Sequence, residues 1–266
     1  MTGRAIRTSS HGQSESLMAT SQPKEGLTES YARWRSSRLG RITDALEQQL
    51  LLELLGPVAD KTLLDVGCGD GALASELARR GAIVTGLDAD PAMIAAARRR
   101  TAIEIPRPRF VAGQAERLPF DDAAFDCILA VTVLCFVRDA ARAVAEMARV
   151  LTPGGRLVIG ELGRWSSWAA HRRIRGWLGN PIWRAARFRT AKELRRVVNT
   201  AGLDVVEFRG AVHYPPYGVA ARLLAPVDLR LGQKTTFGSA FIALSATKPI
   251  EKAHAERRED HAGELL

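Results

Sequence analysis

Residues 63–74 read LLDVGCGDGALA, an apolar run that leads into three alternating glycines and then into a helical pattern. Gly67, Gly69 and Ala72 fit a G-x-G-x-x-G/A spacing, and Gly67, Gly69 and Gly71 fit a G-x-G-x-G spacing. Glycines at a strand-to-helix turn let a ligand approach the backbone, where the first amides of the helix are free to bind it. The stretch therefore predicts a nucleotide-containing ligand at the end of a first strand.

Working outward, apolar runs of strand length alternate with segments of helical period. The expected strands are 61–66, 82–88, 109–113, 125–134, 156–162, 203–212 and 238–248; the expected helices are 31–55, 71–80, 91–100, 140–151 and 190–201. Alternation of this kind is typical of βαβ units. It predicts an α/β fold with a parallel sheet that is covered on both faces.

Composition restricts the class of protein. The chain has 266 residues, of which 46% are hydrophobic and 25% charged, which is typical of one globular domain with additions. No apolar run has the length of a membrane-spanning helix, and three cysteines without Cys/His clusters favour neither a disulfide framework nor a metal site. We expect a cytoplasmic protein with a disordered leader over 1–27, a main domain over 28–248 and a charged, disordered tail over 249–266.

A basic, tryptophan-rich insert over 164–189 interrupts the alternation and holds four of the five tryptophans. Residues 164–198 carry ten basic residues and one acidic residue, an excess equal to the net charge of +9 for the whole chain. Such an insert suits an anionic or amphiphilic small molecule, or an anionic membrane surface, and less well a single-stranded nucleic acid. Alternatively, the tryptophans only pack the insert on the domain while the arginines face solvent. The candidate acceptor-binding residues are Trp165, Trp168, Arg172 and Trp177.

Two carboxylates help to choose between ligands at the glycine turn. Asp88 ends the second expected strand and suits the ribose hydroxyls of either NAD or S-adenosylmethionine. Asp65 precedes the glycines, where it would repel a pyrophosphate but attract the ammonium group of a methionine moiety. The charge pattern favours S-adenosylmethionine, although Asp65 would also suit a purely structural role in bracing the turn.

Five ordered motifs resemble those of class I S-adenosylmethionine-dependent methyltransferases, in particular the group that includes quinone-biosynthesis enzymes. These motifs are LLDVGCGDG, VTGLDAD, AGQAERLPF, FDCILAVTVLCFV and RVLTPGGRLVIGE, within a resemblance that covers roughly residues 31–248. The resemblance implies a Rossmann-like three-layer sandwich around a seven-stranded, mostly parallel sheet of order 3-2-1-4-5-7-6, with the last strand antiparallel. It also implies methyl transfer from S-adenosylmethionine to a small-molecule or lipid-like acceptor.

The resemblance also implies where the cofactor binds. The glycine turn would hold the amino-acid moiety, Asp88 the ribose and the stretch after Gly113 the adenine, while the end of the fourth strand would face the methyl group. Gln114 stands where many relatives have Asp, and its carbonyl can accept the same hydrogen bond. The candidate cofactor-binding residues are Tyr31, Asp65, Gly67, Cys68, Gly69, Asp88, Ala89, Gln114, Ala115, Ala130 and Val131.

Methyl transfer from a sulfonium requires positioning rather than a catalytic triad or a metal ion, and we expect neither. An acceptor that must lose a proton needs a base, for which His213 and Tyr214 are candidates at the end of the sixth expected strand. Three other hypotheses stay open at this point: an NAD(P)-dependent oxidoreductase, an RNA methyltransferase and a non-catalytic domain that binds the cofactor.

Overall fold

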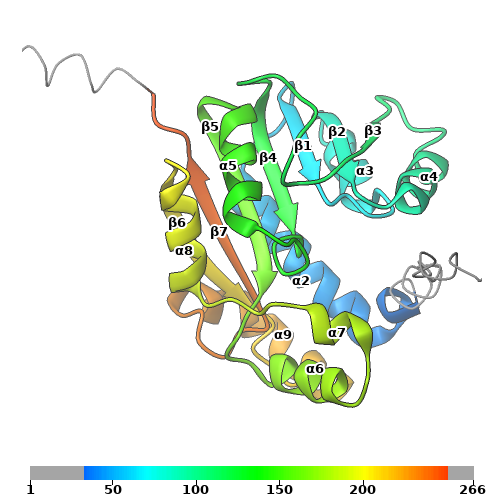
Figure 1. Cartoon of the computed structure of the whole chain (residues 1–266). Helices are drawn as coiled ribbons and strands as arrows, with labels where there is room; N and C mark the ends of the chain where they lie inside the picture. The colour runs from blue at the N-terminus through cyan, green and yellow to red at the C-terminus, as the bar shows by residue number, and fades with distance from the viewer. Residues whose placement is uncertain (1–32, 251–266) are drawn as a thin grey trace, which may run out of the picture.

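Seven strands form one sheet in the computed structural model, which describes residues 33–250 (Figure 1). The strands are β1 (Thr62–Val66), β2 (Ile83–Asp88), β3 (Arg109–Ala112), β4 (Phe125–Val131), β5 (Leu151–Leu162), β6 (Asp204–Ala211) and β7 (Phe241–Thr247). Their order is β3-β2-β1-β4-β5-β7-β6, and β7 runs antiparallel to both of its neighbours. The sheet confirms the fold class expected from the sequence.

Within the described residues 38–234, six of the eight helices begin at a residue whose side chain caps the first turn. The eight helices are α2 (Arg38–Leu55), α3 (Ala72–Arg79), α4 (Pro91–Arg100), α5 (Ala140–Val150), α6 (Ser167–Trp177), α7 (Pro181–Ala185), α8 (Ala191–Thr200) and α9 (Gly218–Lys234). Asp90 caps α4 just before the proline at its first position, and Thr190 with Glu193 forms a capping box on α8. These local signals explain why both helices begin within a residue of the expected place.

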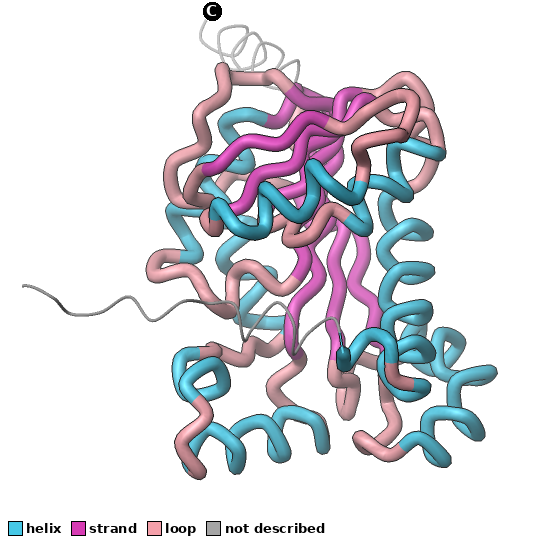
Figure 2. Tube along the Cα trace, turned by 90° about the vertical axis from the view of Figure 1, so that its right-hand side faces the viewer, coloured by secondary structure: helices cyan, strands magenta, loops and turns pink. Residues whose placement is uncertain are grey.

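Both faces of the sheet are buried, and Figure 2 shows helices on either side of it. Along β1, Leu63 packs into a core with residues of α2, α3 and α9, whereas Leu64 and Val66 pack into a second core with α5 and α8. Alternate residues of a strand point to opposite faces, so an unbroken apolar run supplies both cores. This is the physical basis of the three-layer arrangement.

The structure corrects the sequence interpretation in three places. Helix α9 is not among the helices expected from the sequence, and it contains Pro226, a residue that is unfavourable inside a helix. Strand β4 ends at Val131 rather than at residue 134, since Thr132 turns the chain with a φ of 52°. Strand β5 begins at Leu151 rather than at residue 156, and its pairing with β4 shifts register between Leu151 and Arg156.

Other sequence predictions lie beyond the residues that the structure describes. Tyr31 and the expected leader lie outside them, as does the tail after residue 250. Within 33–250, no helix combines the length and the apolar character that crossing a membrane requires.

Candidate active site

The glycine turn after β1 has the backbone that only glycine adopts readily. Gly67, Gly69 and Gly71 have φ values of 73°, 55° and 75°. A Cβ on Gly67 would lie 2.3 Å from Cγ2 of Val133, whereas a Cβ on Gly69 would meet no atom within 4 Å. Gly67 is therefore required by packing, while the space beside Gly69 is open to a ligand.

Asp88 ties the ends of three strands together. Its Oδ2 accepts a hydrogen bond from the Gly69 amide at 2.9 Å, and its Oδ1 accepts one from the Asp90 amide at 2.9 Å. Its carbonyl accepts a hydrogen bond from the Gly113 amide at 3.0 Å, which brings the loop of Gln114 to the same sheet edge. Each carboxylate oxygen has a second lone pair, so Asp88 keeps the capacity to accept hydroxyl donors.

Asp65 is a buried carboxylate that lines a cavity of about 180 Å³ at the ends of β1 and β4. Burial, together with the negative charge of Asp88, raises the pKa of Asp65 to about 7. Its Oδ2 has no hydrogen-bond partner among the described residues. A buried carboxylate oxygen without a partner is costly, and a cationic ligand group would satisfy it.

Five of the candidate cofactor residues meet around this cavity. They are Asp65, Gly67, Cys68, Gly69 and Val131. The Cys68 thiol is buried, which raises its pKa, so Cys68 lines the wall as a neutral group. Ala130 and Ala115 instead belong to the core between the sheet and α5, whereas Gln114 and Ala89 are exposed at the sheet edge.

Helix α2 and the residues before it cover the cavity with polar side chains that the sequence analysis missed. The polar side chains of this cover are Arg35, Asp44, Glu47 and Gln48, and the apolar Leu51 lines the cavity beside them. Arg35 bonds to Asp44 at 3.2 Å and to Asp70 at 3.5 Å, so it joins the covering segment to the glycine turn. The spacing of the covering residues, three or four positions apart along α2, puts them on one helical face and was the available signal.

Glu47 has the most strongly shifted carboxyl group of that cover. Burial raises the pKa of Glu47 to about 8, and the positive charge of Arg172 in α6 opposes the shift. A group with a pKa near neutrality can accept a proton and release it again under physiological conditions. Glu47 lines the cavity, whereas His213 and Tyr214, the two bases predicted from the sequence, are not among the lining residues.

The loop after β4 is held in place by a second buried carboxylate. Thr132 lines the cavity and donates its amide hydrogen bond to Gly160 at 2.7 Å. Two residues later, the Leu134 amide donates to Oε1 of Glu161 at 2.7 Å. Burial raises the pKa of Glu161 to about 7, against the charge of Arg189. Glu161 therefore fixes the wall of the cavity from beneath.

His213 and Tyr214, the predicted bases, pack away from the cavity lining. The Tyr214 hydroxyl is fully buried 3.0 Å from that of Thr43, and burial raises its pKa to about 12. His213 has Nδ1 3.5 Å from Oδ1 of Asp228, and its amide donates to Oδ2 of the same residue at 2.7 Å. The structure does not bring either side chain into the lining, and Asp228 uses this contact to hold α9 against the end of β6.

The predicted acceptor residues separate into two groups. Trp168 is only 6% exposed, and its indole nitrogen donates to the Tyr214 carbonyl at 2.9 Å, so it anchors α6. Arg172 lies over the rings of Trp168 and Trp183, with its Cζ 5.1 Å and 4.9 Å from their centroids. Trp165 and Trp177 are exposed. Packing thus accounts for Trp168, whereas Trp177 still has a free face.

Comparison of the sequence with known proteins shows to which family the chain belongs. A sequence profile described as "Methyltransferase domain" matches residues 64–159. A protein named ubiquinone biosynthesis O-methyltransferase, from a Methylobacterium species, is 32% identical over 228 residues, which span 82% of this chain and 90% of that protein. The chain belongs to the class I S-adenosylmethionine-dependent methyltransferases.

Two further matches cover most of the chain, and the second is to the structure of a methyltransferase. An uncharacterised protein of Mycobacterium tuberculosis is 34% identical over 232 residues, which span 87% of this chain and 74% of that protein. The crystal structure of an S-adenosylmethionine-dependent methyltransferase from Thermotoga maritima superposes with a TM-score of 0.64 at 25% identity, over 85% of this methyltransferase and 97% of that chain. These matches do not favour the oxidoreductase, RNA methyltransferase or non-catalytic hypotheses.

Proposed function

We propose that this methyltransferase transfers a methyl group from S-adenosylmethionine, bound in the cavity under α2, to a small-molecule acceptor. The observation that carries the proposal is the buried Asp65 carboxylate, whose Oδ2 lacks a partner among the described residues and whose side chain lines that cavity. The methionine part of the cofactor carries the ammonium group that such an oxygen requires. The open space at Gly69 gives room for the ligand next to the backbone.

The sheet edge supplies partners for the rest of the cofactor. Asp88 would accept the ribose hydroxyls, and the Gln114 carbonyl would accept from the adenine amino group. The bound cofactor supplies an electrophilic methyl carbon on a sulfonium, which an acceptor atom displaces in line. The chain's own contribution is to hold the acceptor close and to exclude water with α2 and α6.

Glu47 is our candidate for removing a proton from the acceptor, in place of His213 and Tyr214. Its carboxyl lines the cavity and has a pKa of about 8. An acceptor that loses a proton as it attacks the methyl group would transfer it to Oε1 or Oε2 of Glu47. An acceptor whose attacking atom has a free lone pair and no proton to lose needs no such base.

The acceptor that the insert supports is amphiphilic or anionic. Trp165, Ile174, Trp177 and Leu178 expose apolar side chains among arginines of α6. This combination suits a molecule with an apolar body and an anionic group, including one held in an anionic membrane surface. The O-methyltransferase relative, whose name refers to ubiquinone biosynthesis, is consistent with such an acceptor.

Calorimetric titration tests the cofactor. We expect S-adenosylmethionine and S-adenosylhomocysteine to bind and NAD not to bind; binding of NAD with neither sulfur compound would overturn the proposal. Screening of metabolite extracts with methyl-labelled cofactor, with and without anionic lipid vesicles, then identifies the acceptor class. Label incorporated only into RNA would contradict a small-molecule acceptor.

A further inference from the structure

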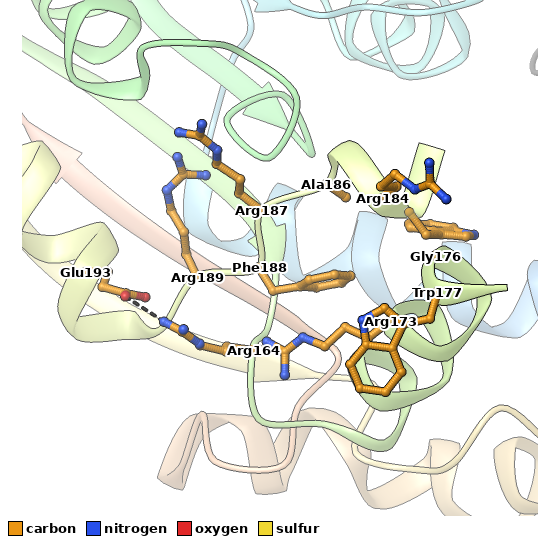
Figure 3. A pocket seen from close by; sticks show the side chains of 11 residues that line it. Arg164, Arg173, Gly176, Trp177, Arg184, Ala186, Arg187, Phe188, Arg189 and Glu193 are labelled. Atoms are coloured by element: carbon orange, nitrogen blue, oxygen red, sulfur yellow. Dashed lines mark hydrogen bonds and ion pairs between the residues drawn. The ribbon is translucent and has the colours of Figure 1, made fainter. Parts of the chain in front are cut away.

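A second, larger cavity of about 840 Å³ is lined in part by residues of the insert helices α6 and α7 (Figure 3). We call it the arginine pocket, after the five arginines in its lining: Arg164, Arg173, Arg184, Arg187 and Arg189. One carboxylate, that of Glu193, accompanies them. The volume lies in the range of small-molecule sites, and the charge excess favours an anionic occupant.

Three of these guanidinium groups already have partners. Arg164 pairs with Glu193 at 2.8 Å, and Nη1 of Arg189 donates to the Leu134 carbonyl at 2.6 Å. Arg173 lies over the ring of Phe188, with Cζ 5.3 Å from the centroid. These contacts position the positive charges without neutralising more than one of them.

The other two, Arg184 and Arg187, are exposed and have no side-chain hydrogen bond or ion pair with another residue in the described range 33–250. Figure 3 shows Arg187 projecting in the same direction as Arg189, with Arg184 on the other side of Phe188. A guanidinium group without a partner presents a fork of donors that matches the two oxygens of a carboxylate or phosphate. Arg184 and Arg187 are therefore the residues available to bind an oxyanion.

Aromatic rings give the pocket flat apolar walls. Trp177 is 83% exposed, and the rings of Trp183 and Phe188 complete the walls. Arg172 stacks on Trp183 and fixes it against α6. Covering the face of a large exposed indole with a ligand ring removes apolar surface from water, which is favourable. The walls therefore suit a planar ring carried by the anion.

The arginine pocket borders the loop that begins in the cofactor cavity. The Arg187 amide donates to the Cys135 carbonyl at 3.0 Å, and Arg189 bonds to the Leu134 carbonyl. Thr132, which lines the cofactor cavity, lies only three residues before Cys135. The pocket thus lies just beyond the carboxyl ends of β4 and β5, at the edge where ligands of such sheets bind.

We propose that the arginine pocket binds the anionic group of the methyl acceptor, an oxyanion carried on a planar ring, through one of the two guanidinium groups that lie on opposite sides of Phe188, that of Arg184 or that of Arg187. The inference rests on the proposed methyl transfer and extends it by naming the class of acceptor. The ring would lie against Trp177 and Phe188, and the anion would orient the molecule towards the loop of Thr132.

Calorimetry with three matched probes tests the binding step. 1-Naphthoate and 1-naphthyl phosphate share a ring with neutral 1-naphthol, so the three compounds separate a carboxylate, a phosphate and no anion. We expect at least one anionic probe to bind more than about ten-fold more tightly than naphthol, because charge-assisted hydrogen bonds are stronger than neutral ones. The tighter anion identifies the oxyanion.

Matched variants show where the probe binds. The double variant Arg184→Gln/Arg187→Gln should weaken the anionic probe about ten-fold or more. Arg99→Gln/Arg196→Gln removes the same charge from exposed positions outside the pocket lining and should change the affinity by less than about two-fold. All variants should bind S-adenosylhomocysteine as the native chain does, which separates failure of this inference from failure of the proposed function.

Three results would overturn the inference. The first is that neither anionic probe binds, and the second is that naphthol binds as tightly as the anionic probes. The third is that the two double variants lose affinity for the anionic probe by the same factor. Once an acceptor is identified, Arg184→Gln/Arg187→Gln should raise its KM about ten-fold and leave kcat within about two-fold, because the pocket binds a part of the molecule that does not react. A loss confined to kcat would contradict binding at this place.

Discussion

The two cavities at the carboxyl edge of the sheet have opposite charge. Four carboxyl groups and one arginine line the cavity under α2, whereas five arginines and one glutamate line the arginine pocket. The first is built on strand ends that the fold requires, and the second on an insert after β5. The difference shows that the framework supplies acidic groups, which suit a cationic ligand, while the insert supplies basic groups, which suit an anionic one.

Arg172 and the loop after β4 separate the two charge environments. Arg172 opposes the raised pKa of Glu47 on one side and stacks on Trp183 of the arginine pocket on the other. Electrostatic interactions between neighbouring charged groups are strong where water is excluded. An acceptor that spans both places would therefore be oriented by its charge as well as by its shape.

Gly67→Ala should have the largest effect, because it attacks the framework of the acidic cavity. The new Cβ would meet Val133 at 2.3 Å in a backbone with a φ of 73°, so we expect a loss of about 3 kcal/mol in the free energy of unfolding. Gly179→Ala, between α6 and α7, has a φ of 99° but meets no atom within 4 Å, and should cost about 1 kcal/mol. Urea denaturation measures both; equal losses would show that Val133 moves aside freely.

Asp65→Asn removes the charge that we assign to the cofactor ammonium. Loss of one charge-assisted hydrogen bond, about 2 kcal/mol, should weaken S-adenosylhomocysteine about 30-fold in calorimetry. Asp121→Asn, an exposed carboxylate outside the cavity lining, is the matched control and should have little effect. Unchanged affinity in Asp65→Asn would return Asp65 to a structural role.

The same pair of variants gives a pH test. Because the pKa of Asp65 is raised to about 7, the carboxyl is protonated below that value and loses its attraction for an ammonium. Affinity for S-adenosylhomocysteine should therefore rise as the pH is raised from about 5.5 to about 7, a range in which an α-amino group stays protonated. In Asp65→Asn the rise should be reduced, whereas Asp121→Asn should retain it.

Trp168→Phe should have the smallest effect and sharpens the division within the insert. It removes the donor to the buried Tyr214 carbonyl, at a cost of about 1 to 2 kcal/mol in the free energy of unfolding. Trp177→Phe, at an exposed position, should stay within about 0.5 kcal/mol of the native chain. Thermal denaturation measures both. A larger loss in Trp177→Phe would place that indole in the core rather than at a ligand.

The alternation of strands and helices and the glycine turn were predictable because they depend on local patterns, whereas the order of the strands in the sheet was implied by the resemblance to the methyltransferase family. Leu64 lies in an unbroken apolar run that predicts a strand buried on both faces, and the glycines mark the turn that follows. Asp65, Gly67 and Gly69 do line one cavity, as their spacing suggested. The roles assigned to them stay predictions until ligand binding is measured.

The cover of that cavity and the details of the insert were not predictable in the same way. In the sequence Glu47 is one more polar residue of an amphipathic helix, and only the tertiary structure shows that it lines the same cavity as Asp65. Trp168 and Trp177 both lie in the same basic, tryptophan-rich insert, yet Trp168 is buried and Trp177 is exposed. Helix α9 was not among the expected helices, and Asp228 stabilises it through contacts distant in sequence.

The sequence alone determined the alternation of strands and helices and the turn after β1, because each depends on residues a few positions apart, and its five ordered motifs indicated the family. Only the tertiary structure decided which charged groups share a cavity. Glu47 with Asp65, and Arg164 with Arg187, come together because separate elements end at one edge of the sheet. Burial at that edge then raises the pKa values of the carboxyl groups, which is a property of the enclosed space rather than of any segment.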